Sequence, residues 1–73
     1  MLSVECQIMI ASGICFVLDS HSPMLMNTML NVLEKHWSEF ESPIKQNILN
    51  ELKDYLKKNV NDSLSNFVSR KAF

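Results

Sequence analysis

The sequence predicts an all-α protein of three to four antiparallel helices, arranged either as helical hairpins of the α-solenoid type or as a small helix bundle. Two Ser-Pro dipeptides, Ser22-Pro23 and Ser42-Pro43, each precede a stretch whose apolar residues recur at spacings of three and four. A serine side chain can cap a helix, and proline fits the first turn because its missing N–H would have no partner there. The 73 residues include one glycine and are 47% apolar, which excludes a disordered chain and fits a single domain over residues 1–73.

The first helix is expected over residues 3–18, and the polar sequence Asp19-Ser20-His21 should end it. Residues 6–18 carry no charge, so this helix is expected to be packed on more than one side. Gly13 lies in its middle, where glycine destabilises a helix by up to about 1 kcal/mol relative to alanine. We therefore expect a neighbouring helix to approach closely at Gly13.

Apolar stripes define the three helices that follow. The second is expected over residues 23–40, capped by Ser22, and the third over residues 43–58, capped by Ser42. A shorter fourth helix is expected over residues 62–70, with Asp62 as its cap. In chain order, the stripes consist of Met26, Met29, Leu30, Leu33, Trp37 and Phe40, with Leu25 and Val32 beside them; Ile44, Ile48, Leu49, Leu52, Tyr55 and Leu56; and Leu64, Phe67 and Val68.

Four residues of the second helix are candidates for binding a partner: Met26, Met29, Trp37 and Phe40. Methionine side chains adapt to irregular surfaces, and a large aromatic side chain at a helix end can anchor a partner in a groove. The alternative is that these residues fill the core, and helical spacing favours it. Both interpretations stay open at the level of sequence.

Residue types that support catalysis or metal binding do not form a recognisable motif. A metal site would need Cys6, Cys15, His21 and His36, whose spacing matches no zinc pattern. The two cysteines are separated by about 900° of helical rotation, which puts them on opposite faces. There is no Gly-x-Ser-x-Gly motif and no glycine-rich phosphate loop. We expect a protein that is not an enzyme and has no cofactor or metal, with its cysteines as core residues in the reducing cytoplasm or nucleus.

Charge is distributed unevenly along the chain. All seven basic residues lie within residues 34–73, whereas residues 1–33 contain two charged residues, Glu5 and Asp19. The net charge of −1 disfavours nucleic acid as a partner. The uncharged run at residues 6–18 is too short for a membrane span and has no basic residue before it, so membrane binding is disfavoured too. A peripheral membrane helix at residues 6–18 is kept as an alternative.

Residues 22–56 resemble HEAT-type helical repeats of the importin and exportin superfamily. The resemblance rests on His36-Trp37, Phe40, Pro43, Ile44, Ile48, Leu52 and Leu56. The same His-Trp and proline, with Gln46, are also similar to large helical-repeat regulators that partner a tRNA ribose methyltransferase. This resemblance implies a non-catalytic scaffold or protein-binding module, related to transport or tRNA modification, whose partner is another protein or neighbouring helical repeats.

A second hypothesis is a free-standing helical protein that forms a homodimer through its apolar first helix. The surface expected to be buried between the two copies comprises Ile8, Met9, Phe16 and Val17. A dimer of this kind would account for the large apolar fraction of so short a chain.

Overall fold

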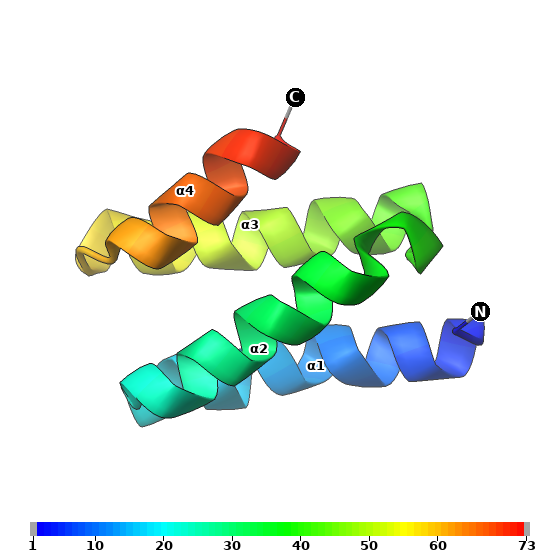
Figure 1. Cartoon of the computed structure of the whole chain (residues 1–73), viewed down its shortest axis with the longest axis horizontal. Helices are drawn as coiled ribbons and strands as arrows, with labels where there is room; N and C mark the ends of the chain where they lie inside the picture. Colours follow the sequence, from blue (N-terminus) through cyan, green and yellow to red (C-terminus); the bar gives the residue numbers. More distant parts are fainter. Residues whose placement is uncertain (1, 73) are drawn as a thin grey trace.

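A computed structural model describes residues 2–72, so residues 1 and 73 of the predicted domain lie outside the described range. The chain forms four α-helices: α1 (Val4–Ser20), α2 (Pro23–His36), α3 (Ser42–Lys58) and α4 (Asp62–Lys71) (Figure 1). A 3-10 turn, η1 (Trp37–Glu39), follows α2 directly. The described residues contain no β-strand, and the predicted all-α class is confirmed.

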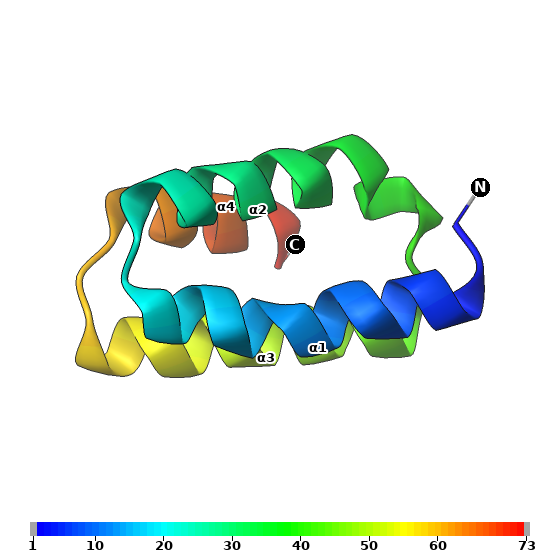
Figure 2. The same cartoon turned by 90° about the horizontal axis from the view of Figure 1, so that it is seen from below.

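The helices form two stacked hairpins. In one layer α1 lies beside α3, and in the other α2 and α4 run across them (Figures 1 and 2). The first helix contacts both α2 and α3, while α4 packs against α3. The first helix makes these contacts with a single buried stripe (Gln7, Ile14 and Leu18), so the prediction that it is packed on more than one side is wrong. Links of two to five residues force this antiparallel order, because they are too short to carry the chain to a distant part of the molecule.

Side-chain caps begin three of the four helices. The hydroxyl oxygen of Ser3 accepts from the N–H of Cys6 (3.2 Å), and that of Ser22 accepts from the N–H of Leu25 (3.4 Å). The amide oxygen of Asn61 accepts from the N–H of Leu64 (3.1 Å). These oxygens pair with N–H groups that have no partner within the helix. The predicted cap at Ser22 is confirmed.

Two predicted caps are wrong by one residue each, and the end predicted for the second helix is wrong by four residues. Ser42 lies inside α3, whose first hydrogen bond runs from the N–H of Lys45 to the carbonyl oxygen of Glu41 (2.9 Å). Asp62 is also helical, because Asn61 provides the cap instead. The second helix ends at His36, since the backbone tightens into η1 before Phe40. Proline and aspartate suit any position in a first turn, so neither distinguishes the cap from the residue after it.

All four helices contribute to one core, and the apolar stripes predicted for α2, α3 and α4 supply most of it. Trp37 is half-buried, and its ring meets the edge of Phe67 at 5.3 Å between centroids. The ammonium of Lys45 lies 5.9 Å from the centre of the same indole. The buried apolar residues are Ile14, Leu18, Met26, Met29, Leu30, Leu33, Phe40, Ile44, Ile48, Leu49, Leu52, Leu64, Phe67 and Val68.

A group of polar contacts fastens the start of α1 to the connection between α2 and α3; we call it the N-terminal clasp (Leu2, Gln7, His36, Glu39 and Glu41). The buried Gln7 amide donates to the carbonyl oxygen of Leu2 (3.1 Å) and accepts from the N–H of Glu41 (2.9 Å). The carboxylate of Glu39 accepts from the N–H of Leu2 (2.8 Å) and lies 2.6 Å from Nδ1 of His36. These contacts join segments more than thirty residues apart.

The stability of the protein should depend on pH through Glu39. The hydrogen bond with His36 and the one from the N–H of Leu2 hold the pKa of this carboxyl below its ordinary value of 4.5. A group with a lowered pKa stabilises the fold above its unfolded pKa and loses that contribution as pH falls through the folded pKa. Urea midpoints of wild type and Glu39→Gln should therefore differ at pH 6 and converge as the pH falls through the folded pKa, which lies below 4.5. A gap that widens on acidification would contradict this assignment.

Candidate interaction surface

The predicted partner-binding residues lie mostly inside the protein. Met26, Met29 and Phe40 are buried, and Trp37 packs its half-buried ring on Phe40 and Phe67. Their side chains fill the core, which is the alternative that the helical spacing favoured. A surface that could bind a partner has to be built from other residues.

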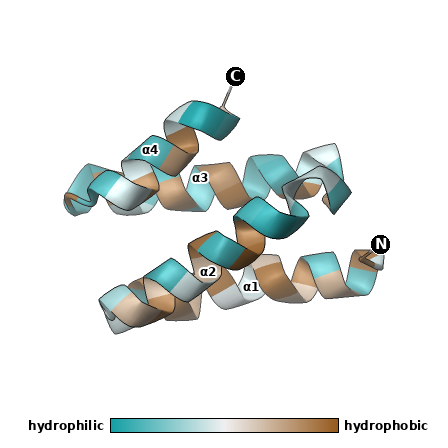
Figure 3. Cartoon of the chain, in the orientation of Figure 1, coloured by the Kyte–Doolittle hydropathy of each residue, from teal (hydrophilic) through white to brown (hydrophobic). Residues whose placement is uncertain are grey.

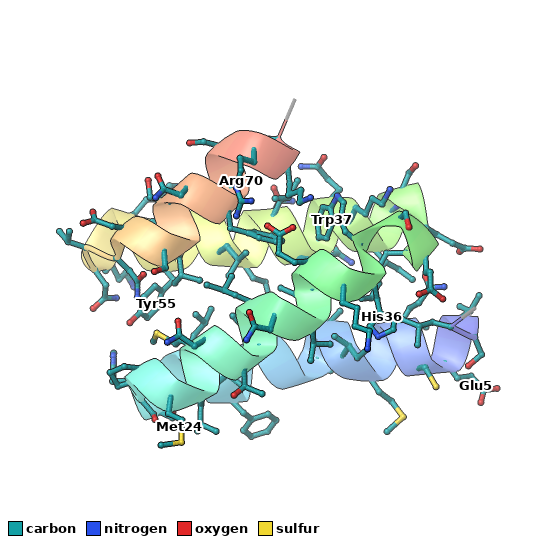
Figure 4. The ribbon with its side chains drawn as sticks, in the orientation of Figure 1. Glu5, Met24, His36, Trp37, Tyr55 and Arg70 are labelled. Atoms are coloured by element: carbon teal, nitrogen blue, oxygen red, sulfur yellow. The ribbon has the colours of Figure 1, made fainter. Side chains whose placement is uncertain are left out.

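Such a surface lies on the side of α1 and α2 that turns away from α3 and α4. We call it the apolar face, and its members are Met9, Phe16, Met24, Leu25 and Val32. Met9, Phe16 and Met24 are 72%, 79% and 76% exposed, so most of each side chain is in contact with water. Figure 2 looks onto this side of the molecule, and Figure 4 shows Met24 pointing outward from the start of α2.

A shallow groove of about 230 Å³ runs between α1 and α2 within the apolar face. Met29 contributes to its wall, and Thr28 is its one polar side chain. Its lining is Ile10, Gly13, Ile14, Val17, Leu25, Thr28, Met29 and Val32. The groove therefore offers apolar contacts and little hydrogen bonding to whatever occupies it.

The apolar face exists because α1 is apolar on all sides but buries one narrow stripe. Its buried residues are Gln7, Ile14 and Leu18, which share one side of the helix. Met9 and Phe16 are seven residues apart, so they share a side of the helix. Each comes two residues after a buried residue, Gln7 or Ile14, which places it on the side opposite the buried stripe. In Figure 3 the ribbon of α1 is mostly pale to brown, whereas α3 and α4 alternate brown with teal.

Gly13 lies in the groove, and the predicted close approach of a helix at this position is wrong. A Cβ atom built on Gly13 would meet no atom within 4 Å. The missing side chain leaves space on the α1 side of the groove instead. Gly13 therefore lies at an open surface. The positions of apolar residues in the sequence could not distinguish this surface from a closely packed helix contact.

Both cysteines are exposed, so the prediction that they are core residues is wrong. They lie outside the buried stripe of α1. Because this helix is apolar on all sides, an apolar neighbourhood in the sequence does not show which residues are buried. Cys15 borders a second hollow, of about 460 Å³, between the end of α1 and α3. Its thiol donates to the carboxylate of Glu51 (2.9 Å), and this hydrogen bond, together with partial burial, raises the pKa of Cys15. The thiolate that a nucleophile requires is thereby disfavoured.

The second hollow is lined mostly by polar side chains from the end of α1 and from α3. Within it, Nδ1 of His21 lies 3.3 Å from the hydroxyl of Tyr55. Across residues 2–72, no three His, Cys, Asp or Glu side chains are grouped so that they could hold a metal ion. Within the same residues, no helix combines the length and apolar character needed to cross a membrane.

Comparison with known proteins identifies no relative: no family model, curated protein or solved structure matches this chain.

Proposed function

We propose that this chain is a non-catalytic protein-interaction module, which acts as a scaffold by presenting its apolar face to a protein partner. The observation that carries the proposal is the exposure of Met9, Phe16 and Met24 around an uncharged groove. Apolar surface concentrated in this way typically marks an interaction site, because leaving it in water is unfavourable. The hydrogen bond from Cys15 to Glu51, which raises the pKa of this thiol, supports the non-catalytic part.

The stacking of two hairpins supports a HEAT-like role for the module. Helical-repeat proteins stack hairpins so that each buries the apolar side of its neighbour. The apolar face lies at one side of the stack, on α1 and α2, where a neighbouring repeat or a partner would pack. The resemblance to helical-repeat proteins keeps a connection with transport or with tRNA modification in the proposal. The two free thiols support a location in the reducing cytoplasm or nucleus.

A photo-crosslinking amino acid at position 16 tests the proposal in cells that express the chain. Position 16 lies on the apolar face, and position 57 on the exposed side of α3 provides the matched control. We expect discrete protein adducts from position 16 and none from position 57. The position-16 adduct should fall about tenfold when Leu25→Gln and Val32→Gln place polar groups in the groove. Equal adducts from both positions, or none from either, would overturn the proposed function.

A further inference from the structure

We propose that the partner on the apolar face is a second copy of this chain, related by a two-fold axis that runs parallel to α1 and α2. This inference rests on the proposed function and names its partner. In such a dimer, α1 of each copy lies on α2 of the other, and four helices enclose the two grooves. The argument for it comes from the charges at one end of the apolar face.

The central part of the apolar face carries no charge, and its charged residues stand at one end. Glu5 lies one turn before Met9 on α1, and Lys35 lies close to one turn after Val32 on α2. Both side chains are exposed. Because α1 and α2 are antiparallel, the start of α1 and the end of α2 share an end of the hairpin. The hydrogen bond from the N–H of Leu2 to Glu39 fixes this relation.

A two-fold axis parallel to the helices preserves position along the hairpin while exchanging α1 with α2. Glu5 of one copy then faces Lys35 of the second copy, and symmetry forms this pair twice. Along the uncharged middle, Phe16 of one copy meets Met24 and Leu25 of the other, and Met9 meets Val32. The arrangement therefore combines apolar contact with two pairs of opposite charge.

The other symmetric arrangement has its axis across the helices, and it lacks this complementarity. It places α1 on α1 and α2 on α2, with their directions opposed. Glu5 and Lys35 then lie at the opposite end of the face from Lys35 and Glu5 of the second copy, so neither pair of opposite charges forms. Pairs of opposite charge form only with the axis parallel to the helices, so the charges of this chain select that axis.

Reversal of single charges tests both the second copy and the axis. We expect sedimentation equilibrium of the purified chain to show a monomer–dimer equilibrium, with Glu5→Lys and Lys35→Glu each raising the dissociation constant about tenfold. The double variant Glu5→Lys/Lys35→Glu should restore most of the affinity, because it re-forms the pairs with their signs exchanged. Circular dichroism at the lowest concentration checks that each variant remains folded.

Matched controls separate the interface from general effects of charge. Asp62→Lys makes the same change in the first turn of α4, and Lys58→Glu makes it in the last turn of α3, both away from the apolar face. Neither should change the dissociation constant. Unchanged or tighter association of Glu5→Lys would overturn the proposed axis. A chain that stays monomeric up to about 1 mM would overturn the second copy, and binding of that monomer to phosphatidylcholine vesicles would assign the apolar face to a membrane surface instead. A monomer that still gives adducts from position 16 would leave the proposed function standing.

Discussion

Replacement of Phe67 with alanine should leave most of the protein unfolded at room temperature. Phe67 is 1% exposed, and its ring packs at 88° against Trp37, where α4 meets the end of α2. Truncation of a buried phenylalanine costs about 3–5 kcal/mol, through lost burial and through the cavity that remains. A core of this size supplies about 3–5 kcal/mol of net stability. The expected loss therefore equals the whole stability of the domain.

Trp37 is a convenient probe of this effect, since it is the chain's one tryptophan and touches Phe67. Phe67→Leu keeps part of the packing and should lower the melting temperature by about 5–15 °C, which keeps the effect measurable if Phe67→Ala does not fold. Phe16→Ala is the matched control, because the same atoms are removed from an exposed position. At low concentration it should change stability by less than about 0.5 kcal/mol. A Phe67→Ala variant that melts like wild type would mean that α4 is not docked on the core.

Ion pairs add less to the docking of α4 than Phe67 does. Glu34 on α2 lies 2.6 Å from Nη2 of Arg70 and 3.2 Å from Nζ of Lys71. Arg70 is well exposed, so solvent screens the pair and its contribution is of the order of 1 kcal/mol or less. The pairs join α4 to α2, while Phe67 supplies most of the energy that docks α4.

The amphipathic helices could be predicted from the sequence because each buries a single stripe. The stripe of α4 coincides with its buried residues, from Leu64 to Val68. The stripe of α3 does so from Ile44 to Leu52, while its last members, Tyr55 and Leu56, are half-buried. On α2 the same holds for Met26 to Leu33, but Leu25 and Val32, which border the stripe, line the open groove. Periodicity identifies the centre of a buried face well and its edges poorly, because edge positions are decided by the neighbouring helix.

The first helix could be predicted as a helix, but its orientation could not. When nearly every residue is apolar, no periodic contrast indicates which side is buried. Cys6 and Cys15 were therefore expected inside and lie outside, and the exposure of Phe16 could not be distinguished from burial. One signal was present, because Gln7 is a long polar residue within the uncharged stretch. A polar side chain that is buried in such a stretch needs hydrogen-bond partners, which backbone groups can provide. Gln7 marks the clasp that orients α1.

Removal of the Gln7 amide should have the second-largest effect on stability. Gln7 is 3% exposed, and it joins the carbonyl oxygen of Leu2 to the N–H of Glu41. Gln7→Leu has a similar volume but leaves both backbone groups without this partner. A buried polar group that loses its partner costs about 1–3 kcal/mol, so we expect a loss of about 2 kcal/mol in urea unfolding. The amide of Glu41 should also exchange its hydrogen faster, because its hydrogen bond is gone.

Gln46→Leu is the matched control for this change. Gln46 is exposed on α3, where its amide donates to the side chain of Asn50 (3.1 Å), so the same substitution should cost less than about 0.5 kcal/mol there. If Gln7→Leu were instead more stable than wild type, burial of the leucine side chain would outweigh the loss of the two hydrogen bonds. The clasp would then specify where α1 begins without stabilising it, and its loss would appear as disorder at Leu2 rather than as a lower unfolding free energy.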